Sequence, residues 1–313
     1  MNQGVYQDVT NAAYHGGPGV SKSGLDLVRR SPLHYLAATK AREADSEKRS
    51  TPAQVFGTAF HTLLLEPEVF AGSYAQPFIP PQGALKTVEE ISGELASLGL
   101  KTSGTKQAVT DRLREAAPET VFYQDALEAY QSETAGKIVL SPEDFDRLEG
   151  MRAAVMAHPA AARLLTLPGK AEQSVYWTDP ETGVLCRCRP DFWADAGFVV
   201  DLKSTDDASL EGFVRSVVKY RYYVQAPFYL DGVQHATGTA PKGFVFIAVE
   251  KAPPYAVGVY ELDEVFTAIG RDEYREDLAA FKAAEETGAW KGYGEKIQTM
   301  DAPAYLVARR LAA

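Results

Sequence analysis

The sequence is short of cysteine, and this shortage limits the chemistry open to it. Cys186 and Cys188 are the two cysteines among 313 residues. An iron–sulfur cluster needs more thiolates than two residues supply, so we expect no iron–sulfur cluster. The two thiols lie two residues apart on an expected strand and share a face, where they suit packing better than a disulfide.

Long apolar runs are also missing. No stretch approaches the roughly 20 residues that a helix needs to cross a bilayer. The first residues lack the basic and apolar regions of a secretory signal. We therefore expect a cytoplasmic protein with no membrane partner. Its 45% hydrophobic content is enough for a large core, in one large domain or in one domain with a small module.

Positive charge is scarce as well. The chain has 32 lysines and arginines against 42 aspartates and glutamates, which gives a net charge of −10. A non-specific DNA binder gains affinity from basic side chains against phosphates. Net charge averages over the surface, however, and acids at a metal site count as negative until the metal binds. The balance argues against DNA binding by the whole surface and is compatible with a narrow positive channel.

The spacing of apolar residues predicts an α/β protein. The capping residue Ser21 and helical spacing indicate a helix over 21–38, with a break or restart at Pro32. Alternating patterns indicate strands, and a Pro- and Gly-containing turn over 179–183 joins the first two. The remaining expected helices cover 52–65, 142–165, 210–234 and 263–287, and the expected strands cover 173–178, 184–189, 198–202, 243–249 and 256–262.

An acid and a lysine stand out on the strand over 198–202. Because strand side chains alternate between faces, Asp201 and Lys203 share one face. We expect them to project from the strand end, away from the core, with Asp191 brought near by the preceding hairpin. Two carboxylates can hold a hard divalent cation, and a lysine beside it can position or deprotonate a water. The alternative is a strand end with one salt bridge.

These residues resemble a known signature. Pro190-Asp191 followed by Asp201-Leu202-Lys203 is similar to the P-D…(D/E)-x-K motif of the restriction-endonuclease-like nucleases. Residues 57–61 (GTAFH) resemble the upstream histidine helix of RecB- and RecE-type nucleases, and residues 225–229 (QAPFY) resemble their downstream Q-x-x-x-Y helix. Segments 19–23, 176–179 and 290–293 look like the nuclease domain of the RecE (exonuclease VIII) family. The resemblance spans about residues 15 to 305, with a gap at about 82–117.

The resemblance implies a fold and a function. The expected fold is a restriction-endonuclease-like α/β core, a central mixed sheet flanked by helices. The expected activity is a Mg²⁺-dependent exonuclease, with Mn²⁺ able to substitute, that degrades linear duplex DNA from its ends in the 5′→3′ direction. Its product would be single-stranded DNA for phage or prophage recombination. The resemblance also implies a ring-shaped homo-oligomer around the duplex and a single-strand annealing protein as partner.

Two other classes of function stay open. One is a nuclease of another mode, an endonuclease or a single-strand nuclease on the PD-(D/E)XK fold. The other is a catalytically silent DNA-binding protein on the same fold. A silent relative would have lost Asp191, Asp201 or Lys203, and none of the three is lost.

The resemblance also assigns roles to site residues. It implies that His61, Asp191 and Asp201 hold the metal, with Lys203 as the catalytic lysine. Imidazole suits Mg²⁺ less well than carboxylate does, so this set makes a site of modest affinity. A histidine on an apolar helix is otherwise most often a packed residue, and that reading stays open for His61.

Three further residues have two interpretations each. Gln225 and Tyr229 lie one helical turn apart, so they either assist catalysis or belong to an aromatic packing stripe. In the first case Gln225 orients Lys203 or a substrate phosphate. Glu172 resembles an additional acid of some relatives and fits equally well as a solvated residue at the start of a strand.

The gap in the resemblance has a pattern of its own. Residues 85–114 predict two short helices joined by an extended segment, which resembles the SAP motif, a small DNA-binding module. Its basic residues would grip backbone phosphates of duplex DNA, and the alternative is a hairpin that packs on the nuclease body or on a neighbouring subunit. These residues are Lys101, Lys106, Arg112 and Arg114. The expected domains are 1–81 with the histidine helix, the 82–117 SAP-like insertion, and the 118–313 nuclease core.

Overall fold

The computed structural model describes residues 2–44, 51–304 and 310. The chain divides into two compact units. The first comprises Met1–Ser50, Ala160–Ala248 and Val257–Ala313, and the second comprises Thr51–Pro159 and Val249–Ala256. The segment 82–117 is therefore part of the second unit, together with the helix that carries His61.

The strands of the first unit form two sheets within the described residues. The larger sheet has the order β10-β9-β8-β7-β4, and the smaller has the order β1-β5-β6. Strand β7 pairs antiparallel with both β4 and β8, so it lies between them. The bounds are β1 Gly4–Tyr6, β4 Gly169–Ala171, β5 Ser174–Thr178, β6 Leu185–Cys188, β7 Phe192–Ala194, β8 Phe198–Thr205, β9 Gly243–Glu250 and β10 Val257–Glu261.

Strand β8 is longer than the sequence predicts. It continues to Thr205, past the expected end at Leu202, because it lies inside the sheet between β7 and β9. Val200 and Leu202, on the face opposite the acid, are buried, and Asp201 itself is 1% exposed. The expectation that Asp201 projects from a strand end, away from the core, is therefore wrong. The residue sits within a central strand whose two faces are both covered.

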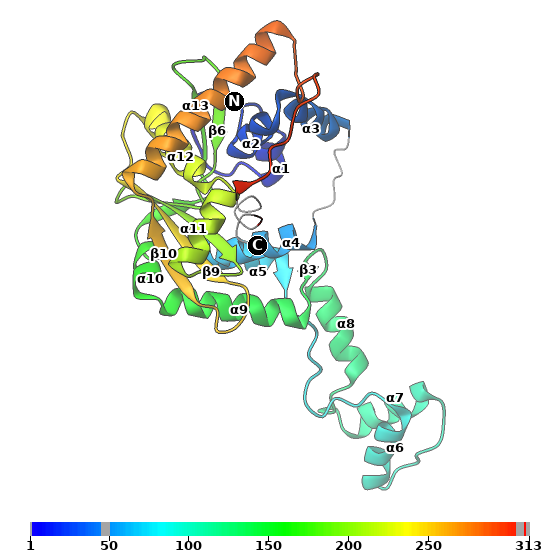
Figure 1. Ribbon diagram of the computed structural model, residues 1–313. Coiled ribbons are helices and arrows are strands. Elements are labelled where there is room, and N and C mark those ends of the chain that lie inside the picture. The colour runs from blue at the N-terminus through cyan, green and yellow to red at the C-terminus, as the bar shows by residue number, and fades with distance from the viewer. Residues whose placement is uncertain (1, 45–50, 305–309, 311–313) are drawn as a thin grey trace. The chain divides into compact units, whose positions relative to one another are not determined.

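Helix α12 is the central helix of the first unit. It packs against α13, α2 and the strands β5 and β6, and Figure 1 shows it beside α13. Two glycines allow this close approach: a Cβ on Gly232 would meet the buried Trp177 ring, and a Cβ on Gly270 would overlap the carbonyl oxygen of Tyr223. The helices of this unit are α1 Asn11–Gly16, α2 Lys22–Arg30, α3 Pro32–Ala44, α10 Pro159–Leu165, α11 Leu210–Lys219, α12 Tyr222–Thr237 and α13 Glu264–Thr287.

Three expected helices are interrupted, two of them at prolines and one at a left-handed residue. The expected break at Pro32 is confirmed, since α2 ends at Arg30 and Ser21 caps its start. The helix expected over 142–165 divides before Pro159, which has no N–H to donate. The helix expected over 210–234 divides into α11 and α12 because Arg221 has a left-handed backbone, with φ 53° and ψ 43°.

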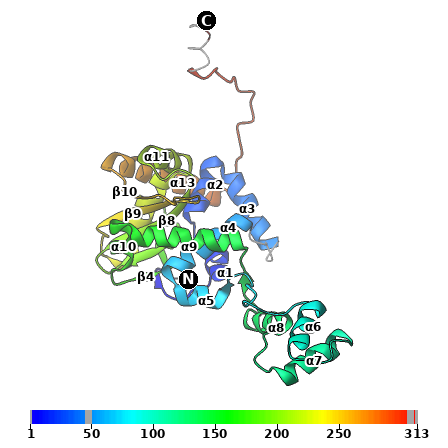
Figure 2. The same cartoon turned by 90° about the horizontal axis from the view of Figure 1, so that it is seen from below.

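The second unit begins with the helix that the sequence predicts best. Helix α4 covers the expected residues, and a capping box between Thr51 and Gln54 fixes its start. Helices α6 and α7 lie side by side in both views (Figure 1, Figure 2). They enclose a separate small core of Ile91, Leu95, Val109, Leu113 and Phe122. The bounds are α4 Pro52–Leu65, α5 Pro67–Ser73, β2 Tyr74–Ala75, α6 Val88–Ser97, α7 Lys106–Ala116, α8 Tyr123–Glu133, β3 Ile138–Val139 and α9 Pro142–Ala157.

The cysteines and the helices bear on two expectations drawn from composition. Cys186 and Cys188 are free and buried, and Cys186 lies in the main hydrophobic core, as expected for packing residues. Among the helices of the described residues, none is both long enough and apolar enough to cross a membrane.

Candidate active site

Three acids lie in a row across neighbouring strands of the larger sheet. The registers of β7 with β8 and with β4, each continued by one residue, place Asp191 opposite both Asp201 and Glu172. The N–H of Glu172 donates to the carbonyl oxygen of Asp191 at 3.1 Å, which extends the ladder to these residues. The first unit alone therefore brings three acids together at the start of β7. Their positions in the sequence are up to 29 residues apart.

Asp191 is held by a backbone donor. The Leu202 N–H donates to Asp191 Oδ2 at 2.7 Å, and Asp191 is 9% exposed. Strand β7 begins one residue later, at Phe192, so the carboxylate takes the place of a strand partner for this N–H. The bond restricts the rotation of the Asp191 carboxyl group. A carboxylate that accepts a backbone N–H is also favoured in its charged form.

Asp201 joins the two other residues of the expected catalytic set. Lys203 Nζ lies 2.5 Å from Asp201 Oδ2, and Gln225 Nε2 donates to Asp201 Oδ1 at 2.5 Å. The side chain of Asp201 is 2% exposed and that of Lys203 is 18% exposed. The structure thus connects Gln225 to the acid, whereas the sequence suggested Lys203 or a phosphate as its partner.

The charge state of Lys203 follows from these neighbours. Burial lowers the pKa of its ammonium, but the carboxylates of Asp201 and Asp191 raise it further, so the pKa stands above that of a free lysine. The lysine is therefore an ammonium ion when the acids carry their negative charge. A role as a base requires that a cation first offset the charge of those acids.

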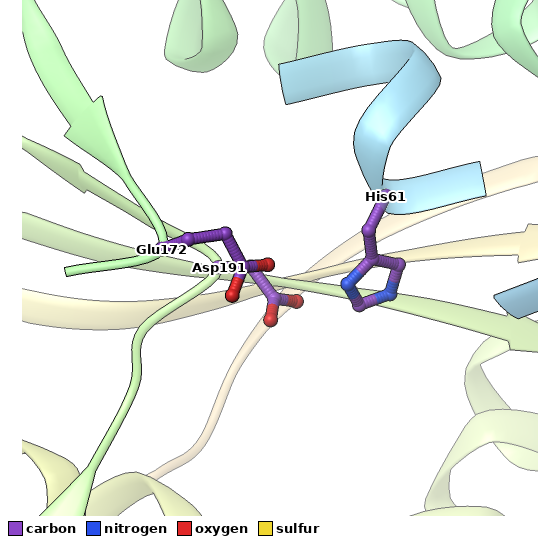
Figure 3. A group of neighbouring side chains, drawn as sticks. All are labelled: His61, Glu172 and Asp191. Atoms are coloured by element: carbon purple, nitrogen blue, oxygen red, sulfur yellow. The ribbon is translucent and has the colours of Figure 1, made fainter. Parts of the chain in front are cut away.

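Glu172 occupies a strained position at the site. Its backbone has a φ of 52°, a left-handed conformation that is uncommon for a residue with a Cβ. Strain of this kind persists only where the surrounding structure enforces it, and it concentrates at functional sites. The carboxylate oxygens of Glu172 and Asp191, both in the first unit, lie within 4.8 Å of each other (Figure 3). Carboxylate oxygens are ligands that suit Mg²⁺ or Mn²⁺. His61 lies on α4 of the second unit, and its role as a metal ligand stays a prediction.

Tyr229 lies among aromatic side chains. Its ring packs edge-on against Phe244, with centroids 5.9 Å apart, and beside Phe228. Burial raises the pKa of its hydroxyl well above the ordinary value, so the phenol stays protonated. Asp201 and Asp191 add to this rise, which places Tyr229 within electrostatic range of the acids. Its catalytic role stays a prediction.

The basic residues of the SAP-like segment also have contacts within the second unit. Arg112 donates to the carbonyl oxygen of Lys101 at 2.5 Å, and Lys106 donates to the carbonyl oxygen of Lys86 at 3.0 Å. Arg114 forms a two-pronged bond with the Asp125 carboxylate of α8, at 2.5 and 2.7 Å. These contacts tie the two helices to their surroundings, and a grip on DNA phosphates stays a prediction.

Tyr222 contacts the site through Lys203. Its ring lies under the Lys203 ammonium, 4.6 Å from the ring centroid. The three-residue spacing between Tyr222 and Gln225 was the available signal, since both lie on one face of α12.

A solved structure shares the fold. A crystal structure of a "putative exonuclease" from Eubacterium rectale matches with a TM-score of 0.54 and 12% identity, over 96% of each chain. A crystal structure of SSO0001 matches with a TM-score of 0.26 and 13% identity, over 71% of this chain and 84% of that one, and carries no argument. No curated protein matches this chain.

The family match covers the whole candidate site. Residues 21–303 match the family described as a PDDEXK-like domain of unknown function, DUF3799. The match confirms the restriction-endonuclease-like fold class and supports a nuclease. The chain belongs to this family of PDDEXK-like domains.

Proposed function

We propose that this protein is a metal-dependent deoxyribonuclease that hydrolyses phosphodiester bonds from the ends of linear duplex DNA. The observation that carries the proposal is the row of Glu172, Asp191 and Asp201 across adjacent strands, with Lys203 bonded to Asp201. Phosphodiester hydrolysis needs an oriented water, compensation of the charge that builds on phosphate, and stabilisation of the leaving oxygen. A carboxylate cluster with one adjacent ammonium supplies the groups for these tasks.

The donor atoms fit a hard divalent cation. Glu172 and Asp191 would hold it through carboxylate oxygens, which lie close together in Figure 3. The family resemblance adds His61 as the proposed nitrogen ligand. Asp201, the third acid of the row, is the other proposed ligand. We propose Mg²⁺, with Mn²⁺ as a substitute. When bound, the cation supplies a water of lowered pKa and offsets phosphate charge.

The chain's own residues have distinct roles. The Leu202 N–H fixes the orientation of the Asp191 carboxylate. Gln225 holds the Asp201 carboxylate by one oxygen and Lys203 holds it by the other, so the acid cannot rotate freely. Lys203 keeps its proton while the acids are uncompensated. If a bound cation offset the charge of the acids, Lys203 would be able to lose its proton, position a water as a neutral amine and take the water's proton. The ammonium that results would then lie beside the scissile phosphate.

The mode of attack on DNA rests on the family resemblance. Residues 57–61 and 225–229 resemble RecE-type motifs, and the structural neighbour from Eubacterium rectale is named a "putative exonuclease". We propose 5′→3′ degradation that leaves single-stranded DNA for recombination. A ring-shaped homo-oligomer and a single-strand annealing partner are further proposals from the same resemblance.

End-labelled substrates test this function. Linear duplex labelled at the 5′ or at the 3′ end is incubated with Mg²⁺, beside a closed circular duplex of the same sequence. The proposal expects early release of the 5′ label as mononucleotides, late release of the 3′ label, and an intact circle. Nicking or linearisation of the circle would instead establish an endonuclease. Binding of DNA with no cleavage in Mg²⁺ or Mn²⁺ would establish a silent DNA-binding protein.

A further inference from the structure

Two stacked tyrosines lead from Lys203 to the surface of the first unit. The Lys203 ammonium lies 4.6 Å from the centroid of the Tyr222 ring. The Tyr220 ring stacks on Tyr222, with centroids 5.6 Å apart and an interplanar angle of 28°. Tyr222 is half-buried, whereas Tyr220 is 48% exposed. A continuous aromatic surface therefore connects the buried lysine of the site with solvent.

Lysines flank both rings. Lys22 Nζ lies 5.8 Å from the Tyr222 centroid, and Lys219 Nζ lies 5.0 Å from the Tyr220 centroid. Lys22 also donates to the carbonyl oxygen of Tyr220 at 2.6 Å, which ties the backbone of this tyrosine to α2. Three ammonium groups thus lie beside the two stacked rings, and one of them, that of Lys22, is ion-paired with Asp26 at 2.7 Å.

The turn that places the rings side by side is strained and clamped. Arg221 separates the two tyrosines and has a left-handed backbone, with φ 53°. Its guanidinium bonds to Asp26 at 3.0 Å, Glu273 at 2.9 Å and Asp277 at 2.7 Å. An uninterrupted helix would point residues 220 and 222 in different directions, because neighbours two apart do not share a face. The ion pairs therefore maintain an unfavourable turn whose result is an exposed, stacked tyrosine.

We propose that Tyr220 stacks an unpaired nucleobase of the DNA strand whose phosphodiester lies at Lys203. Every nucleobase has a π-face, so an exposed aromatic ring beside lysines binds single-stranded nucleic acid with little regard to sequence. Lys219 is placed to bind a phosphate next to that base. The Tyr222 ring contacts both the Tyr220 ring and the Lys203 ammonium, and so connects this stacking step to the catalytic lysine. A base within an intact duplex has its faces occupied by its neighbours, so the step selects a strand that has left the duplex. This inference rests on the proposed nuclease function and adds the conformation of the bound strand.

Binding without cleavage tests the step. A single-stranded oligonucleotide with 2-aminopurine near its end is titrated with protein in EDTA at low salt, and both affinity and quenching of the 2-aminopurine fluorescence are measured. Tyr220→Ala should weaken binding about tenfold, or about 1.4 kcal/mol, and should abolish most of the quenching. Tyr220→Phe keeps the ring and should stay within about twofold of the wild type. Val218→Ala is the matched control, since Val218 is 53% exposed in α11, two residues before Tyr220.

The outcomes separate this inference from the proposed function. Unchanged affinity and quenching in Tyr220→Ala would overturn the stacking step, even if the wild type digests linear duplex. An equal loss for the single strand and for a fully paired duplex would also overturn it, because stacking requires an unpaired base. Conversely, a wild type that cleaves no DNA, yet quenches 2-aminopurine through Tyr220, would sink the nuclease proposal and retain a binding step for single strands.

Discussion

Replacing Asp201 by alanine should destabilise the first unit as well as remove activity. The residue is 1% exposed and carries both an ion pair with Lys203 and a hydrogen bond from Gln225. Removing one partner of a buried ion pair costs about 3–5 kcal/mol, since the other charge stays behind. Lys203 is 18% exposed and regains some hydration, so we expect about 3 kcal/mol. At about 2 °C per kcal/mol for a domain of this size, the melting temperature should fall by about 6 °C.

Two matched variants isolate the ion pair as the cause. Asp201→Asn keeps the shape and an acceptor for Gln225 but leaves the Lys203 charge unpaired, so it should cost nearly as much as Asp201→Ala. The double variant Asp201→Ala/Lys203→Met removes both charges and should recover at least about half of the loss, because replacing both partners is often nearly neutral. All three tryptophans, at positions 177, 193 and 290, belong to the first unit, so their fluorescence in EDTA reports its unfolding directly.

Either of two results would contradict a stabilising ion pair between Asp201 and Lys203. Asp201→Ala could melt at the wild-type temperature, which would mean that the acid does not compensate a buried lysine. Alternatively, the double variant could lose the full sum of the two single losses, which would mean that Asp201 and Lys203 are not coupled.

Four further predictions concern other parts of the chain. His61→Ala should lose activity in Mg²⁺ and regain part of it at high Mn²⁺, whereas a merely packed histidine would give a lower melting temperature with unchanged metal dependence. Gln225→Leu should slow cleavage about tenfold at saturating DNA and leave duplex affinity unchanged, because the Asp201 carboxylate loses a hydrogen bond. An unchanged cleavage rate would show that Gln225 has no positioning role. Replacing residues 84–116 by a short Gly-Ser bridge should weaken duplex binding at every salt concentration, while cleavage at saturating DNA persists. Binding as tight as that of the full chain would show that the segment does not bind DNA. Cys186 and Cys188 should resist alkylation at pH 8 until the protein unfolds, since burial raises the pKa of both thiols, and rapid labelling of native protein would contradict this. Above about pH 8.5 the folded state binds more protons than the unfolded state, so the free energy of unfolding should fall as the pH rises.

The helix starts and breaks that the sequence predicted correctly are determined by residues adjacent in the chain. The bounds of α4 follow from Thr51 and Pro52 at its start, and the break at Pro32 follows from a missing N–H. The motif also identified Asp191, Asp201 and Lys203, which the fold brings together because β7 and β8 pair as a hairpin.

What the sequence could not predict depends on distant residues. The left-handed turn at Arg221 is held by Glu273 and Asp277, more than 50 positions away, and no local signal marks it. The place of Glu172 follows from the pairing of β4 with β7, which a propensity argument cannot assign. The burial of Asp201 required knowledge that β8 is an inner strand.

The central claim is that the acid row at β7 is the catalytic centre of a nuclease. The most direct measurement compares Mg²⁺-dependent degradation of linear duplex DNA by the wild type, Asp191→Asn and the control Asp195→Asn. Asp195 is an exposed acid on the same hairpin. We predict that Asp191→Asn is at least about a hundredfold slower while Asp195→Asn matches the wild type. Degradation by folded Asp191→Asn at close to the wild-type rate would contradict the claim.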